Sequence, residues 1–167
     1  MKNFGLVFIL LFSLASFSQT TTFIVLRHAE KADNSKDTNL SPEGLLRAEE
    51  LKKTLAPVNV NAVYATPYNR TKQTVTPLAT EKRIAITEYP ADKPFTELVN
   101  ELIETYRGNT VVIVGHSNTV PEILKVLSNN TYNVSINENQ FDNLFVVTLT
   151  DGQQPQVVQM KYGKSTP

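Results

Sequence analysis

Short apolar segments alternate along the chain with longer segments whose apolar residues recur at helical spacing. The short segments are rich in β-branched residues, which favours strands, whereas recurrence every three or four positions favours helices that bury one face. The predicted strands are residues 20–26, 60–65, 84–87 and 110–114. The predicted helices begin at Ser41-Pro42 and end before Pro57, run from Thr66-Pro67 to about Lys82 with a bend at Pro77, and cover 95–106 and 119–127.

Two further apolar segments near the end of the chain, 144–150 and 156–162, flank Asp151-Gly152 and predict a terminal hairpin. Strands that alternate with helices predict an α/β fold, a three-layer α/β/α sandwich with a mostly parallel central sheet. Such sheets bind ligands beyond the carboxyl ends of their strands. Arg27-His28 and His116 follow two of the strands, and Arg70 lies in the first turn of a predicted helix, so we expect one site at this edge.

The first residues form a separate unit. A charged start at Lys2 precedes an apolar run over residues 4–17, and Ser16-Phe17-Ser18 follows the small-x-small pattern of a cleavage site. These features are typical of a secretory signal peptide. A membrane anchor is the alternative, but a run of about 14 residues is short for the ~30 Å of hydrocarbon that a helix must cross. We therefore predict a signal peptide over residues 1–18, a single domain over 19–167, and export to the periplasm or the medium.

The composition narrows the range of partners. The 167 residues include no cysteine, 16 basic and 16 acidic residues, and loss of Lys2 with the signal leaves 15 basic residues. Without cysteines there is no disulfide framework and no lipid-modified cysteine, so the exported domain must be stabilised by its core. The near-neutral balance argues against nucleic acid and against the membrane as a partner after signal removal, since both favour a cationic face.

The two histidines of the chain carry the functional signal, because both follow apolar strands. One histidine at a strand end is commonly structural, but here both are so placed and Arg27 adjoins one of them. An arginine at the end of a buried strand needs an anionic partner, because an unpaired guanidinium is costly to desolvate.

The segment Arg27-His28-Ala29-Glu30 resembles the R-H-G/A-E signature of the histidine phosphatase superfamily, which includes phosphoglycerate mutases and acid phosphatases. Three further matches follow in the family's order. They are Asn34, the segment 65–74 with Arg70, and the segment 114–118 with His116. The resemblance covers about residues 20–165 and implies a phosphatase that hydrolyses phosphate monoesters.

This resemblance implies that His28 attacks phosphorus and carries a phosphohistidine intermediate. Arg27 and Arg70 would each grip two phosphate oxygens in a planar fork, His116 would donate to another oxygen if protonated, and Asn34 would contact the phosphate. Neighbouring positive charge should keep His28 neutral by lowering its pKa. These groups supply the positive charge, so we expect no metal and no cofactor, only a small phosphorylated substrate.

The proton donor for the leaving group is less clearly marked. Relatives supply it from a Glu after the third strand or from an Asp directly after the second histidine, and Ser117 occupies the latter position. Asp92 and Glu88 follow the third predicted strand, and we slightly prefer Asp92. Glu97 falls on a predicted helix, and its presence there is explained by a position on the solvent-exposed face of that helix.

Other function classes remain open. A phosphate- or sugar-phosphate-binding module with a degraded site would retain the arginines without turnover. A serine hydrolase is suggested by the segment 115–119, which nearly reads G-x-S-x-G around Ser117, but no histidine follows that serine. A metal hydrolase would have only two histidines without ligand spacing. The sequence leaves the substrate and the oligomeric state open, although export argues against a cytosolic glycolytic mutase.

Overall fold

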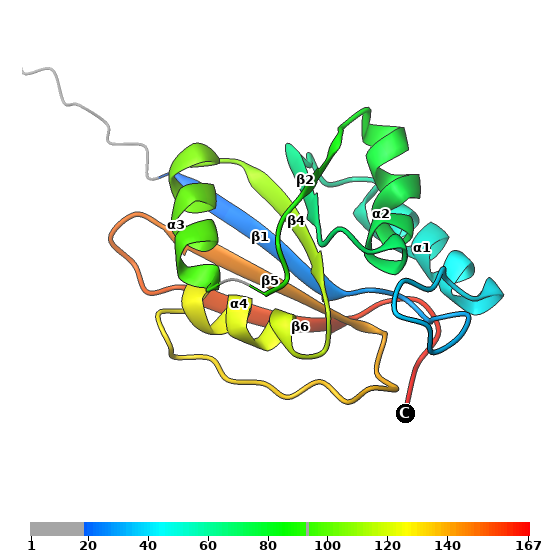
Figure 1. The fold of residues 1–167 in the computed structure, drawn as a ribbon. Helices are drawn as coiled ribbons and strands as arrows, with labels where there is room; N and C mark the ends of the chain where they lie inside the picture. The colour runs from blue at the N-terminus through cyan, green and yellow to red at the C-terminus, as the bar shows by residue number, and fades with distance from the viewer. Residues whose placement is uncertain (1–18, 93) are drawn as a thin grey trace, which may run out of the picture.

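The computed structural model describes residues 19–92 and 94–167, which form one six-stranded sheet with helices on both faces (Figure 1). The predicted signal peptide lies outside the described residues. The strand order is β3-β2-β4-β1-β5-β6. Four strands are parallel, namely β1 (Thr20–Arg27), β2 (Ala62–Ala65), β3 (Ile86–Glu88) and β4 (Thr110–Gly115). β5 (Asn143–Thr150) and β6 (Gln156–Lys161) form the predicted hairpin. β5 pairs antiparallel with β1, and β6 pairs antiparallel with β5 and so runs in the direction of the other four strands.

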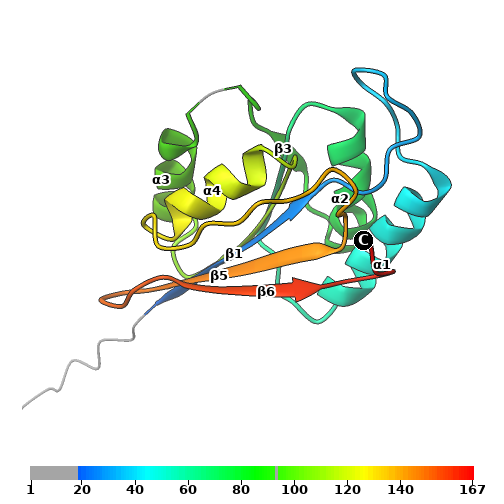
Figure 2. The same cartoon turned by 90° about the horizontal axis from the view of Figure 1, so that it is seen from below.

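The helices form the two outer layers of the sandwich, as Figures 1 and 2 show. α1 (Pro42–Leu55) and α2 (Asn69–Lys82) cover one face of the sheet, and α3 (Phe95–Thr105) and α4 (Thr119–Leu127) cover the other. The predicted three-layer α/β/α architecture is therefore confirmed. None of these helices is both long enough and apolar enough to cross a membrane, within the residues that the structure describes.

The central strand β1 shows why the sheet is buried on both sides. Phe23 and Val25 point into the core under α3 and α4, whereas Ile24 and Leu26 point into the core under α1 and α2. All four side chains are buried, because successive residues of a strand face opposite sides of the sheet. This placement fixes the register of β1 and brings its polar end to one edge of the molecule.

The predicted start was correct for the first helix but not for the second. α1 begins as predicted, with the Ser41 hydroxyl accepting a hydrogen bond from the Gly44 N–H at 3.2 Å. α2 begins at Asn69 rather than at Thr66-Pro67, and its first N–H, that of Asn69, donates to the Asp37 carboxylate at 2.7 Å. The Thr66 hydroxyl is instead buried in contacts with His116 and Thr71. α2 also runs through Pro77 as a single assigned helix.

Candidate active site

The register of β1 and β4 places the two histidines side by side. The strands are parallel, with Arg27 opposite Gly115, and the His28 N–H donates to the Gly115 carbonyl at 2.9 Å. The ring centroids of His28 and His116 lie 5.3 Å apart. With Arg27 and Arg70 they form a group that we call the Arg–His cluster. The expectation that these four side chains meet at one edge of the sheet is met.

His28 is held in a single neutral tautomer. Its side chain is 3% exposed, and its Nδ1 lies 2.7 Å from the Ala29 carbonyl. Because a carbonyl oxygen only accepts, Nδ1 carries the proton and Nε2 keeps its lone pair. Burial first, and then the charges of Arg27, His116 and Arg70, lowers the pKa of His28 to about 3. The imidazole is therefore neutral at neutral pH.

His116 is also neutral in the ligand-free protein. Its Nε2 lies 2.9 Å from the Thr66 hydroxyl, and the Arg70 Nη2 approaches Nδ1 at 3.4 Å. Since a guanidinium only donates, Nδ1 is the acceptor and Nε2 carries the proton. Burial first, followed by the charges of Arg70 and Arg27, lowers the pKa of His116 to about 4. The protonated His116 considered above is thus not the form present before an anion binds.

Arg27 is clamped by a segment more than 100 residues away. Its Nη1 donates to the carbonyls of Asn137 and Gln140 at 2.7 and 3.2 Å. Its Nη2 donates to the Glu138 carboxylate at 2.7 Å, and its guanidinium lies 4.4 Å from the centre of the Phe141 ring. The side chain is 2% exposed, and its buried Nε has no hydrogen-bond partner among the described residues.

Arg70 is oriented in a similar way from the other side. Its Nη1 donates to the Lys36 carbonyl at 3.0 Å, and its guanidinium lies 4.4 Å from the centre of the Tyr68 ring. Its Nε is likewise buried without a partner among the residues described. Four residues later, the Thr74 hydroxyl donates to the Arg70 carbonyl at 2.7 Å and accepts from the Ala29 N–H at 2.9 Å. Thr74 therefore ties the first turn of α2 to the segment that carries His28.

The arginines are already held by protein atoms without a ligand. Sequence reasoning expected each guanidinium to present its planar fork to the phosphate. The Nη atoms of Arg27 and Nη1 of Arg70 are bound to protein oxygens, Nη2 of Arg70 lies 3.4 Å from His116 Nδ1, and the two buried Nε–H groups have no partner among the described residues. Two fixed cations with unpaired N–H donors favour an anion at this position.

Within the described part of the chain, the other predicted residues form no hydrogen bond or ion pair with the Arg–His cluster. Asn34 is exposed, and its side-chain oxygen accepts from Lys31 Nζ at 3.4 Å. The Glu88 carboxylate pairs with Lys72 at 2.9 Å. Glu88 and the exposed Asp92 line a pocket of about 430 Å³ that Tyr68 also borders. Glu97 is exposed on α3, as expected for a residue on the solvent-exposed face of a helix.

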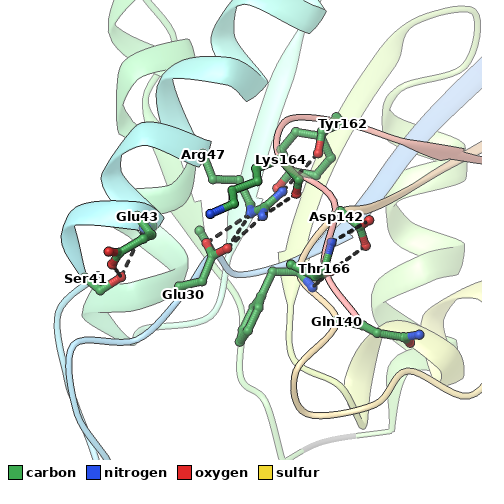
Figure 3. Close-up of polar contacts among 12 residues, drawn as sticks. Glu30, Ser41, Glu43, Arg47, Gln140, Asp142, Tyr162, Lys164 and Thr166 are labelled. Atoms are coloured by element: carbon green, nitrogen blue, oxygen red, sulfur yellow. Dashed lines mark hydrogen bonds and ion pairs between the residues drawn. The ribbon is translucent and has the colours of Figure 1, made fainter.

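Glu30, the last residue of the R-H-A-E segment, has a structural role that Figure 3 shows. It pairs with the buried Arg47 at 2.7 Å, and Arg47 also donates to the carbonyls of Tyr162 and Lys164. The chain after β6 is thereby fixed beside the R-H-A-E segment. Gly44 lets α1 approach this closely, because a Cβ there would lie 2.3 Å from the Glu30 carbonyl oxygen.

An open pocket of about 820 Å³ adjoins this region. Phe141, which stacks on Arg27, forms part of its wall. The pocket is lined by Glu30, Lys31, Ala32, Asp33, Asn34, Ser41, Pro42, Glu43, Arg47, Phe141, Lys164, Ser165, Thr166 and Pro167.

Sequence reasoning missed the residues that hold the cluster from outside. Glu138 and Phe141 contact Arg27, while Thr66 and Tyr68 contact His116. Thr66 and Tyr68 belong to the segment that carries Arg70, so their neighbourhood was marked. The segment 137–141 gave no signal beyond its polarity.

The geometry weakens the alternative enzyme classes. Ser117 donates its hydroxyl hydrogen to Glu138, and the two ring nitrogens of His116 face Thr66 and Arg70. The structure therefore contains no hydrogen bond between Ser117 and a histidine within the described residues. No group of three or more metal-ligating side chains occurs in residues 19–92 and 94–167.

Comparison with known proteins agrees with this arrangement. A family model described as "Histidine phosphatase superfamily (branch 1)" matches residues 23–91, a range that includes Arg27, His28 and Arg70. A search of curated proteins found no match.

Several solved structures share the fold. YhfR from Bacillus stearothermophilus has a TM-score of 0.67 and 16% identity, with 83% of this chain and 95% of that chain covered. The protein histidine phosphatase SixA, in complex with tungstate, has a TM-score of 0.64 and 18% identity, with coverage of 84% and 96%. A mycobacterial glucosyl-3-phosphoglycerate phosphatase has a TM-score of 0.64 and 12% identity, with coverage of 88% and 100%. The family model thus matches the part of the chain that carries Arg27, His28 and Arg70, and the solved structures show that the chain shares their fold.

Proposed function

We propose that the protein is a phosphatase that hydrolyses phosphate monoesters through a phosphohistidine on Nε2 of His28. The observation that carries the proposal is the pair of buried, unpartnered Nε–H groups of Arg27 and Arg70 beside a neutral histidine. A buried donor without a partner costs about 1–3 kcal/mol. Phosphate oxygens would satisfy both donors, and Nε2 of His28 has the free lone pair that attack on phosphorus requires.

The rest of the cluster would stabilise the transferring phosphoryl group. Its charge spreads over three equatorial oxygens, so fixed cations and N–H donors contribute most of the catalysis. Arg27 and Arg70 would bind two of these oxygens, and His116 would donate to a third after the arriving phosphate dianion raises its pKa. Asn34 is a further proposed phosphate contact. Because two guanidinium groups supply the positive charge, we propose that the reaction needs no metal.

The leaving group of an alkyl phosphate needs a proton. Asp92 and Glu88 are the proposed donors, since they lie in a pocket that Tyr68 borders, and the ring of Tyr68 lies 5.3 Å from that of His116. This pocket gives a leaving group room on the side of the cluster near β3.

The named relatives support the substrate class. They include a protein histidine phosphatase, a phosphoserine phosphatase from Entamoeba histolytica in complex with 3-phosphoglyceric acid, and a glucosyl-3-phosphoglycerate phosphatase. We infer a small phosphorylated substrate for this protein.

The test uses p-nitrophenyl phosphate in the presence of EDTA. The protein should release phosphate, and rapid quenching with labelled substrate should trap a phosphohistidine that is stable in base and labile in acid. His28→Asn keeps a donor for the Ala29 carbonyl but removes the nucleophile, so turnover and the trapped intermediate should both disappear. Glu122→Gln, an exposed change on α4, is the matched control and should turn over normally. Near-normal turnover by His28→Asn would refute the proposal.

A phosphate-binding module with a degraded site is the second candidate. It is favoured by the same unpartnered Nε–H groups, which bind an anion whether or not a bond is broken. Binding of inorganic phosphate without turnover of any phosphate monoester would support it.

We also propose that the protein is exported, on the basis of the apolar run over residues 4–17. Mass spectrometry of the protein from the host's periplasm or medium should give an N-terminus at or near Gln19. Intact Met1 on cytoplasmic protein would contradict export.

A further inference from the structure

Glu138 is the carboxylate attached to the Arg–His cluster. One oxygen accepts from the Arg27 Nη2 at 2.7 Å, and the other accepts a short hydrogen bond from the Ser117 hydroxyl. Within residues 19–92 and 94–167, no other carboxylate forms a hydrogen bond or an ion pair with Arg27, His28, Arg70 or His116.

The two groups that hold Glu138 are the chain neighbours of the two histidines. Arg27 precedes His28, and Ser117 follows His116. The backbone on both sides of Glu138 is fixed as well, because the Asn137 and Gln140 carbonyls accept from Arg27. The carboxylate is nevertheless 77% exposed. It is therefore held in one place at the cluster while water can reach it.

Glu138 does not block the phosphate position inferred above. It occupies Nη2 of Arg27, whereas the unpartnered donors are the Nε–H groups of Arg27 and Arg70. An anion can bind these Nε–H groups without displacing the carboxylate. Glu138 thus remains beside the site when the phosphoryl group is present.

We propose that Glu138 is the general base for hydrolysis of the phosphohistidine, an inference that rests on the proposed function. A water oxygen attacks phosphorus, the bond between phosphorus and Nε2 of His28 breaks, and its electron pair returns to Nε2. The proton lost by the water passes to a Glu138 oxygen. Inorganic phosphate leaves, and Glu138 then releases the proton to solvent.

The protonation state of Glu138 suits this step. The hydrogen bond from Ser117 is the largest influence and, with the charge of Arg27, holds the pKa of Glu138 below its ordinary value despite partial burial. The group is therefore ionised at neutral pH and ready to accept a proton. A positioned general base contributes roughly 10²–10⁴ in rate, and the loss should fall on the second step alone.

Rapid-quench kinetics with p-nitrophenyl phosphate separate the two steps. Glu138→Gln keeps an oxygen acceptor and the size of the side chain but removes the base. We expect a burst of p-nitrophenol at the wild-type rate, followed by a steady state slower by at least about 10², with phosphohistidine accumulating. Glu122→Gln removes the same charge from an exposed position on α4 and should behave as wild type. In Glu138→Ala, added formate should restore part of the steady-state rate.

Three results would overturn the proposal. An equal fall in the burst rate and the steady-state rate would show that Glu138 only positions Arg27. A lower KM with unchanged kcat would show that it competes with the substrate. If wild-type protein turns over without forming phosphohistidine, the proposed function itself fails, a result that no Glu138 variant can produce.

Discussion

The two buried neutral histidines should make the stability of the protein sensitive to mild acid. In the unfolded chain a histidine has a pKa near 6.5, whereas burial and the adjacent arginines lower the pKa of His28 to about 3 and of His116 to about 4. As the pH falls from 7 to 5, the unfolded state binds protons that the folded state does not. The free energy of unfolding therefore falls with pH.

The magnitude follows from these pKa values. At 1.36 kcal/mol per pKa unit, each histidine should cost about 2 kcal/mol between pH 7 and pH 5, and the pair about 4 kcal/mol. The chain contains only these two histidines, so no other imidazole contributes. Glu138 and Asp142 are carboxylates whose pKa values are lowered by folding. Their contribution to the free energy of unfolding is lost only when the pH falls below the pKa of an unfolded carboxylate, near pH 4, which lies outside this window.

Urea denaturation at pH 7 and pH 5 measures this difference directly. His28→Asn and His116→Gln should each reduce the acid-induced loss to about 2 kcal/mol, and the double variant should nearly abolish it. Each variant is compared with itself at the two pH values, so its overall change in stability does not enter. A wild-type loss below about 1 kcal/mol, or an undiminished loss in the double variant, would refute the reasoning.

Three further predictions concern single contacts. Arg70→Ala should lower kcat/KM for p-nitrophenyl phosphate by roughly 10²–10³, by analogy with the loss of one oxyanion donor, and Arg70→Lys should recover only part of it; an activity near that of wild type in either variant would contradict this. Asp92→Asn should slow alkyl phosphates much more than p-nitrophenyl phosphate, whose leaving group needs little protonation; the same selectivity in Glu88→Gln instead would transfer the donor role to Glu88. Arg47→Met should lower the free energy of unfolding by about 3 kcal/mol, because it leaves Glu30 partly buried and unpaired; a urea midpoint close to that of wild type would contradict it.

The sequence predicted the fold well because its signals are local and strong. The run Phe23–Leu26 is buried on both faces, so its uninterrupted apolar pattern identified a central strand. The start of α2 was wrong for a tertiary reason. Thr66 has the right chemistry for a helix cap, but its hydroxyl binds His116, which is 50 residues away. Such a contact leaves no local pattern.

The site also contains residues that the sequence predicted and residues that it did not. Arg27, His28 and His116 follow strands whose ends meet at one edge, so topology alone predicted their meeting. Glu138 was missed because it lies in a polar segment with no assigned strand or helix. Only the packing of that segment around Arg27 brings its carboxylate to the cluster.

The arginines show how the backbone changes the chemistry that residue type suggests. Carbonyls of Asn137 and Lys36 hold Nη atoms of Arg27 and Arg70 before any ligand is present. Each guanidinium is thus oriented in advance, and a bound phosphate would not bear the entropy cost of ordering it. A lysine at either position has one nitrogen, which cannot both bind the carbonyl and occupy the place of Nε. Arginine is therefore favoured at both positions because one end of its side chain is held by the protein while the other presents an N–H.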